Sequence, residues 1–263
     1  MLHYHGTPCG ATREDVARFL SGRHALIPWV RPEDIGTAAE VCQSFCLDNG
    51  AFTAWKSGKP ITDWSEYFRW AAEWLQHPGC DFAIIPDVID GSEDDNNALL
   101  AKWHQKVKGR SQFRGAPVWH LHESMSRLQW LCGHYDRVCL GSSGKWPTPG
   151  SKKDGWWLRI AEAMKVCCDE RGVPQTKLHG LRMLDPAIFS KLPLASADST
   201  NAVRNSSSYK RFGMYIPPNA STRMSIIAER IEKHQSVAIW VPGSEVFEAD
   251  SEQAIQGELF EVA

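Results

Sequence analysis

Three aspartates follow short apolar runs in the sequence, a pattern that points to chemistry at the ends of strands. Asp48 ends "SFCLD", Asp87 ends "DFAIIPD", and Asp198 lies within "LASADS". A single aspartate in such a place is more often a helix cap or a satisfied structural group. Three carboxylates brought into one mouth repel one another, however, so their joint presence favours acid–base or nucleophilic chemistry.

Other polar and small residues stand at the ends of similar runs. Phe52 lies four positions after Asp48, and the small residues between them let a ligand approach the carboxylate. The other run ends carry His3 and His5, His120 and His122, Gly141 with Ser142 and Ser143, and His179 with Gly180. These residues are the candidate lining of a site.

Eight apolar runs that alternate with segments of helical periodicity must position these residues. The runs cover 2–6, 24–29, 44–48, 81–87, 117–122, 137–142, 177–183 and 194–199. Alternating strands and helices predict a parallel sheet, and eight repeats favour an α/β fold of the (β/α)₈ TIM-barrel type. Active sites in such barrels lie at the C-terminal ends of the strands. An open doubly wound sheet is the structural alternative.

The predicted barrel domain covers residues 1–235. Within it, 201–221 is rich in Ser, Asn and basic residues and predicts a long extended loop, followed by a helix over 222–235. The apolar "SVAIWV" (236–241) predicts an extra strand, and the chain then runs to residue 263 in an acidic tail. We therefore expect 236–263 to be an appendage of the barrel.

Composition limits the class of protein. The 263 residues are 43% hydrophobic and 23% charged, which is ordinary for a globular protein with a real core. No apolar run approaches the roughly 20 residues that a membrane helix needs. The N-terminus lacks the basic start and apolar run of a signal peptide, so we expect a cytoplasmic protein. The eight cysteines favour buried reduced thiols over disulfides or a zinc site.

Charge is unevenly distributed although the net charge is only −2. Residues 151–235 hold fourteen Lys and Arg against eight Asp and Glu, and the last thirty residues hold six acids and no Lys or Arg. A basic region of this kind suits a surface that faces phosphates, and a solvated mixed surface is the alternative.

An ordered set of motifs over residues 44–205 resembles the queuine/archaeosine tRNA-guanine transglycosylases. "LDNGAF" (47–52) resembles the family's strand end of Asp, small residue, Gly and aromatic, and "IIPD" (84–87) its base-reading aspartate. "WHLHES" (119–124) is similar to a strand ending in Gln-Gly, "CLGSSG" (139–144) to a Gly-Gly-Leu loop, and "LHGLR" (178–182) to a Leu-Met-Gly strand. "ADSTNAVRN" (197–205) is similar to the nucleophile segment, with Arg204 six residues after Asp198.

Two departures from that family bear on the substrate. The tRNA enzymes carry a CxCxxC…His zinc site after the nucleophile segment, whereas this chain has no cysteine after Cys168. The chain is also short for a tRNA enzyme. Both features resemble the phage-type relatives that exchange guanine in DNA for a 7-deazaguanine. We therefore expect a barrel without the zinc subdomain, with DNA and a free 7-deazaguanine base such as preQ0 as partners, and no metal or cofactor.

The resemblance implies a role for each candidate residue. Asp198 would capture the sugar C1′ as a covalent nucleophile, and Asp48 would act as general acid/base on the departing and arriving bases. Asp87 would accept N1–H and N2–H of guanine, and Phe52 would stack on the base. His122 and the backbone near Gly141, Ser142 and Gly180 would complete the base pocket. Phosphates that flank an extruded guanine would be held by Arg204, Lys210 and Arg211.

Other functions remain open at this point. The same exchange on tRNA is the nearest alternative. A metal-dependent hydrolase of the amidohydrolase kind would use His3, His5, His120 or His122, and Asp198 as ligands, although it leaves "LDNGAF" unexplained. "LGSSGKW" (140–146) hints at a phosphate loop but departs from the Walker pattern, and a nucleic-acid-binding barrel without catalysis is a further possibility.

Overall fold

A computed structural model describes residues 1–10 and 12–243, and its central element is a sheet of nine parallel strands. The strands are β1 (Leu2–Gly6), β2 (His24–Pro28), β3 (Ser44–Asp48), β4 (Cys80–Ile84), β5 (Gly115–Ala116), β6 (Val118–His120), β7 (Arg137–Gly141), β8 (Lys177–Gly180) and β9 (Ser196–Ser199). Each of the eight runs predicted from the sequence overlaps a strand. The fifth run contains β6, whereas β5 ends just before the first residue of that run, Pro117, which has no N–H to donate and so interrupts the strand.

The sheet closes into a barrel through this interrupted strand. The hydrogen-bonded order is β5-β4-β3-β2-β1-β9-β8-β7-β6, and its two end strands are consecutive in the chain. On one side Ile85 N–H donates to Ala116 O, and on the other Cys139 N–H donates to Pro117 O. The predicted (β/α)₈ barrel is therefore confirmed, and the open doubly wound alternative is wrong.

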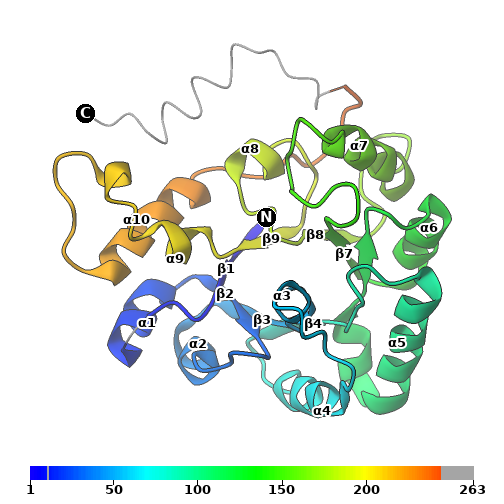
Figure 1. Ribbon diagram of the computed structural model, residues 1–263, viewed down its shortest axis with the longest axis horizontal. Coiled ribbons are helices and arrows are strands. Elements are labelled where there is room, and N and C mark those ends of the chain that lie inside the picture. The colour runs from blue at the N-terminus through cyan, green and yellow to red at the C-terminus, as the bar shows by residue number, and fades with distance from the viewer. Residues whose placement is uncertain (11, 244–263) are drawn as a thin grey trace.

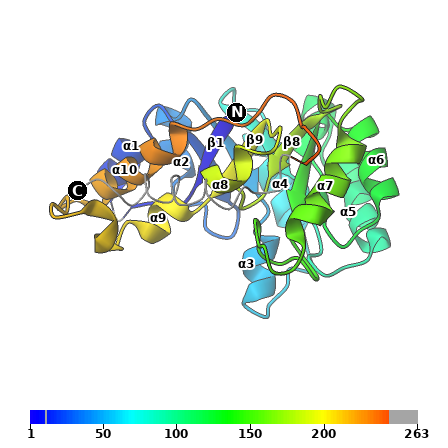
Figure 2. The same cartoon turned by 90° about the horizontal axis from the view of Figure 1, so that it is seen from above.

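Helices surround the strands in Figure 1, as the alternation in the sequence predicts. The α-helices are α1 (Arg13–Leu20), α2 (Ile35–Val41), α3 (Ala51–Lys56), α4 (Ser65–Trp74), α5 (Glu93–Lys106), α6 (Met125–His134), α7 (Trp156–Cys167), α8 (Pro186–Phe189), α9 (Asn201–Asn205) and α10 (Ala220–Glu232), with 3₁₀ turns η1 (Gly109–Arg114) and η2 (Tyr209–Phe212). Figure 2 shows α3, which directly follows β3, projecting away from the body of the barrel.

Two apolar layers hold the barrel together. The larger layer lies between the strands and the helices and includes Phe45, Leu47 and Trp119. The smaller one fills the barrel interior with Tyr4, Leu26, Cys46, Phe82, Ile84, Ala116, Val118 and Cys139. Residues that alternate along one strand therefore belong to different layers, as the pleat of a strand requires. This alternation decides which side chains reach the site.

The chain after β9 differs from the sequence-based expectation. Residues 201–221 contain α9 and η2 and are not one extended loop, and α10 begins at Ala220. No strand forms over the described residues 236–243. The barrel is already closed, so this apolar stretch meets no unpaired strand edge. It packs instead through the buried Trp240, whose backbone N–H donates to Gly172 O. The acidic tail from 244 lies outside the described residues.

None of the helices in the described part of the chain is both long enough and apolar enough to span a bilayer.

Candidate active site

A cavity of about 730 Å³ opens at the C-terminal ends of the strands and collects most of the expected residues. All three aspartates line it: Asp48 at the end of β3, Asp87 just after β4, and Asp198 in β9. Phe52, Gly141, Ser142 and Arg204 line it as well. Segments more than 100 residues apart in the chain thus contribute to one site, as the ordered strand-end motifs predict.

Strand alternation explains why these side chains face the cavity. Cys46 points into the barrel, so Asp48, two residues on, has the same orientation at the strand end. By the same rule Val118 and Cys139 lead to His120 and Gly141, both of which line the cavity. The apolar interior layer thus forms the floor of the site, and the polar residues follow two positions later along the same strands, at their C-terminal ends.

Asp48 is held by the turn that starts α3. Its Oδ1 accepts a 3.2 Å hydrogen bond from Gly50 N–H, and Gly50 has a φ of +78°, which favours glycine. The pKa of Asp48 is raised to about 7, mainly by burial and in smaller part by the charges of Asp198 and Asp87, against backbone hydrogen bonds that lower it. A carboxyl group that titrates near neutral pH can both give and take a proton, which suits general acid–base chemistry.

Asp198 has one oxygen fixed and the other available. Its Oδ1 accepts a 3.0 Å hydrogen bond from the backbone N–H of Arg182. In the described part of the chain, Oδ2 has no hydrogen-bond partner, although the residue lines the cavity and is only 5% exposed. A carboxylate anchored through one oxygen, with the other directed at the ligand space, has the geometry that a nucleophile needs.

A series of polar contacts between side chains inside the barrel leads to Asp198. Arg137 pairs with Asp81 at 2.9 Å and donates to Ser196 Oγ at 2.7 Å. Ser196 Oγ and His179 Nδ1 are hydrogen-bonded at 2.8 Å. His179 Nε2 lies 3.3 Å from Asp198 Oδ1 but is too poorly aligned for a hydrogen bond.

Burial lowers the pKa of His179, and the neighbouring Asp198 partly offsets this effect. The imidazole is therefore neutral near pH 7. It contributes a dipole, and not a full positive charge, beside the Asp198 carboxylate.

Asp87 is engaged on both oxygens by neighbours that the sequence-based assignment omitted. Asn49 Nδ2 donates to Oδ1 at 2.8 Å, and His120 Nε2 lies 2.9 Å from Oδ2. Each carboxylate oxygen has a second lone pair, so both can still accept a hydrogen bond from a ligand. Asn49 belongs to the same turn as Asp48 and therefore ties the ends of β3 and β4 together.

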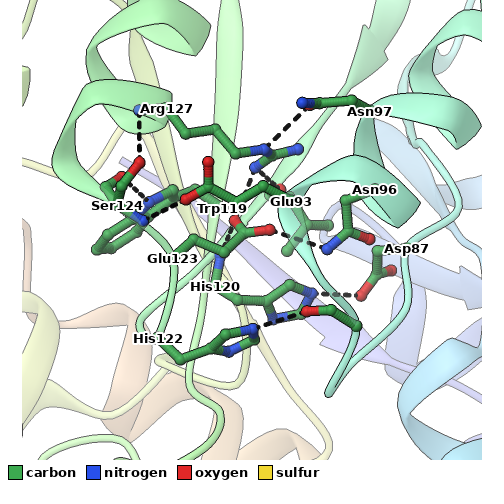
Figure 3. A network of polar contacts seen from close by, with 12 residues as sticks. Asp87, Glu93, Asn96, Asn97, Trp119, His120, His122, Glu123, Ser124 and Arg127 are labelled. Atoms are coloured by element: carbon green, nitrogen blue, oxygen red, sulfur yellow. Dashed lines mark hydrogen bonds and ion pairs between the residues drawn. The ribbon is translucent and has the colours of Figure 1, made fainter.

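A buried ion pair fixes the end of β6, and so the position of His120 (Figure 3). Glu123 and Arg127 pair at 2.7 Å, and each side chain is at most 3% exposed. Glu123 also accepts from the His120 backbone N–H at 2.9 Å and from Asn96 Nδ2 at 2.9 Å. Breaking one member of such a buried network leaves an unpaired charge and is costly.

Arg182 is a further residue that the sequence-based assignment of roles omitted. Its guanidinium carbon lies 4.0 Å from the centre of the Phe52 ring, and its Nη2 donates to the carbonyl oxygens of Ser142 and Pro147 at 2.9 and 3.3 Å. Its φ is +59°, the only positive φ outside glycine among the described residues. A non-glycine residue is held in this conformation only when its surroundings enforce it, which is typical of functional sites.

Four of the residues to which the resemblance gives a role lie outside the cavity lining. His122 is exposed and contacts Ser143 Oγ and Gly91 O. The strand ends at His120, so His122 already belongs to the following turn. Gly180 does not line the cavity; a Cβ there would lie 2.8 Å from Met183 and 2.9 Å from Leu194, so the glycine serves packing. Lys210 and Arg211 lie on η2, away from the cavity lining.

The ligand set expected for a metal-dependent hydrolase is not assembled. His3 and His5 flank the inward Tyr4 on β1, so they face the outer layer, where they contact Phe189 and Phe19. His5 is bonded to Glu232 of α10 at 2.8 Å. Within residues 1–10 and 12–243, no three His, Cys, Asp or Glu side chains form a group that could hold a metal ion.

Comparisons with known proteins give a likeness in fold. No protein-family model matches the chain, and no curated protein matches it. The chain is similar to the crystal structure of a protein assigned as a fructose-1,6-bisphosphate aldolase from Coccidioides immitis, with a TM-score of 0.55, 14% identity, and 88% of this chain and 90% of the other covered. It is also similar to a mutant tryptophan synthase α-subunit from Pyrococcus furiosus, with a TM-score of 0.51, 11% identity, and 88% and 97% covered. At these identities the likeness establishes the fold and nothing further.

Proposed function

We propose that the protein is a base-exchange transglycosylase that replaces guanine in DNA with a 7-deazaguanine base through a covalent aspartyl-sugar intermediate. The observation that carries this proposal is the convergence of Asp48, Asp87 and Asp198 in one cavity, each in a different environment. Asp48 has a pKa near 7, Asp87 has both carboxylate oxygens hydrogen-bonded, and Asp198 has one carboxylate oxygen without a partner among the described residues.

In this reaction Asp198 attacks C1′ of the target nucleotide as the glycosidic bond to guanine breaks. The free Oδ2 forms the ester, while the Arg182 N–H and the nearby His179 keep Oδ1 in place. Asp48 gives a proton to the departing guanine and takes one from the arriving base, which then displaces the ester and restores Asp198. The two displacements give net retention at C1′.

Base recognition is assigned to Asp87. Guanine and 7-deazaguanine present N1–H and N2–H side by side, and the two Asp87 oxygens each keep one lone pair for them. Asn49 and His120 fix the carboxylate plane from the opposite edge. Adenine lacks this pair of adjacent donors, so the pocket would reject it.

DNA is the proposed substrate because the zinc site of the tRNA enzymes has no counterpart in the sequence after Asp198. A guanine within a duplex would have to be extruded into the cavity, as other enzymes that act on bases require. Arg204 lies on the cavity rim in α9, where it can meet a neighbouring phosphate.

The test offers purified protein and labelled 7-cyano-7-deazaguanine to duplex DNA in one reaction and to unmodified tRNA in another. We expect label in DNA, no label with Asp198→Asn, and normal labelling with Asp94→Asn, an exposed aspartate of α5. Labelling of tRNA alone would overturn the choice of DNA. Absence of label in both nucleic acids would overturn base exchange itself.

A further inference from the structure

The guanidinium of Arg182 occupies one face of Phe52, the ring that the resemblance assigns to stacking on the base. Its central carbon lies 4.0 Å from the ring centre, which is a cation–π contact. A base cannot lie directly on this face of the ring while the guanidinium is there. Either Arg182 moves aside, or the base stacks on Arg182.

The hydrogen bonds of Arg182 favour the second arrangement. Nη2 donates to Ser142 O at 2.9 Å and to Pro147 O at 3.3 Å, and both bonds hold the guanidinium by its edge. Since the N–H bonds of a guanidinium lie in its plane, bonds at the edge leave both faces open for stacking. One face meets Phe52, and the residue also lines the cavity.

The backbone of Arg182 explains how the side chain is placed there. Its φ of +59° sends the N–H to Asp198 Oδ1 at 3.0 Å, while the side chain returns over Phe52. One strained residue thus links the carboxylate with the free oxygen to the aromatic ring of α3. The strain is retained because two carbonyl groups and the ring hold the side chain.

We propose that Arg182, backed by Phe52, is the stacking surface for a planar heterocycle in the cavity, in the order Phe52, guanidinium, ligand ring. Guanidinium planes stack on nucleobases as well as on aromatic side chains. The identity of that heterocycle as a guanine-type base rests on the proposed function. The stack itself requires only a flat aromatic ligand.

The test measures binding of guanine, 7-cyano-7-deazaguanine and adenine by calorimetry to the wild type, Arg182→Lys, Arg182→Gln, Phe52→Leu and the double variant Phe52→Leu/Arg182→Lys. Lys and Gln carry a Cβ as Arg does, so the backbone strain and the N–H bond to Asp198 are unchanged. Lys retains the charge and removes the plane. Thermal melting and circular dichroism confirm that each variant is folded.

We expect Arg182→Lys to weaken binding of 7-cyano-7-deazaguanine by about tenfold or more. Phe52→Leu should also weaken it, and the double variant should bind no more weakly than Arg182→Lys, because the two residues act as one stack. Wild-type affinity in Arg182→Lys would overturn the stack. So would an Arg182-dependent affinity for inorganic phosphate together with unchanged affinity for the bases.

Two outcomes separate the stack from the proposed function. Binding of adenine in preference to guanine, lost in Arg182→Lys, would support the stack and contradict the guanine assignment. Exchange of label into DNA by Arg182→Lys with wild-type base affinity would support the function and overturn the stack. Failure of the wild type to bind any of the three bases would overturn the stack as well.

Discussion

Asp87 Oδ2 and His120 Nε2 lie 2.9 Å apart and join two strand ends that are separated in the chain by α5 and β5. The other nitrogen of His120, Nδ1, is buried and has no hydrogen-bond partner among the described residues. A Cβ on Gly141 would lie 3.1 Å from this atom, so glycine at that position leaves the imidazole its space. Asp87 and His120 therefore form one unit in the lining of the cavity.

We predict that Asp87→Asn weakens binding of a 7-deazaguanine base by about tenfold to a hundredfold. The amide NH₂ would have to face Asn49 or His120, and the remaining oxygen cannot accept both N1–H and N2–H. An unpaired buried donor costs about 1–3 kcal/mol, which gives that range. Calorimetry measures the affinity, and an unchanged value would assign base reading to another residue.

A second prediction separates the two histidines of "HLH". His120→Asn should weaken base binding because it removes the partner that orients Asp87. His122→Asn should leave base binding within about twofold, since His122 is exposed and contacts Ser143 and Gly91. The two variants serve as matched controls in the same calorimetric titration. A loss confined to His122→Asn would restore the assignment made from sequence.

A third prediction concerns Asp48 and pH. The pKa of Asp48 rises from an ordinary value of 3.8 to about 7 in the fold, so the fold favours its protonated form. Well below pH 3.8 the Asp48 carboxyl is protonated in both the folded and the unfolded protein, so it does not affect the free energy of unfolding. As pH rises from about 3.8 to about 7, the unfolded protein loses this proton first, which lowers the free energy of unfolding, and the loss is complete above about pH 7.

Asp48→Asn should therefore be more stable than wild type at pH 8 by up to about 4 kcal/mol, and nearly equal to it at pH 4. Denaturant unfolding at a series of pH values measures the difference. Asp94→Asn, which changes an exposed carboxylate, is the control and should show almost no pH-dependent difference. A constant gap between Asp48→Asn and wild type across this range would contradict the raised pKa.

The barrel could be predicted from sequence because its strands are buried on both faces. Such strands appear as short continuous apolar runs, and each of the eight predicted runs overlaps a strand, whereas the two-residue β5 lies outside them. Residues 236–241 show the limit of this reasoning. The stretch has the composition of a strand, but pairing depends on a free edge, and the closed barrel offers none. Closure is a property of the whole chain, which no local run reveals.

The candidate site was predictable where strand alternation alone decides orientation. Asp48 and Asp198 continue the inward face of their strands and reach the cavity as expected. The resemblance assigned His122 to the base pocket because it stands where the transglycosylases have Gln, but β6 ends at His120, and that is the histidine that lines the cavity. The role of Arg182 could not be predicted, because the placement of its side chain depends on a backbone φ of +59°, and no residue type in "LHGLR" indicates such a φ at this position.

The last prediction tests how nucleic acid is held. Arg204 lines the cavity rim in α9, whereas Lys210 and Arg211 lie on η2 outside the cavity lining. We expect Arg204 to contact the phosphate beside an extruded base, and the other two to contact phosphates further along the strand. Each phosphate contact releases condensed counterions, so binding of duplex DNA should weaken steeply with salt.

Replacing Arg204 with Ala should reduce the slope of log affinity against log salt by about one unit, and replacing all three basic residues by up to about three units. Fluorescence anisotropy with a labelled duplex at several salt concentrations measures the slope. Lys106→Ala, which removes an exposed charge at the end of α5, should leave the slope unchanged. If the triple variant retained the wild-type slope while Lys106→Ala reduced it, the DNA would lie over α5 and not over the segment that follows Asp198. The guanine would then be extruded too far from Arg204 of α9 for this residue to hold the neighbouring phosphate.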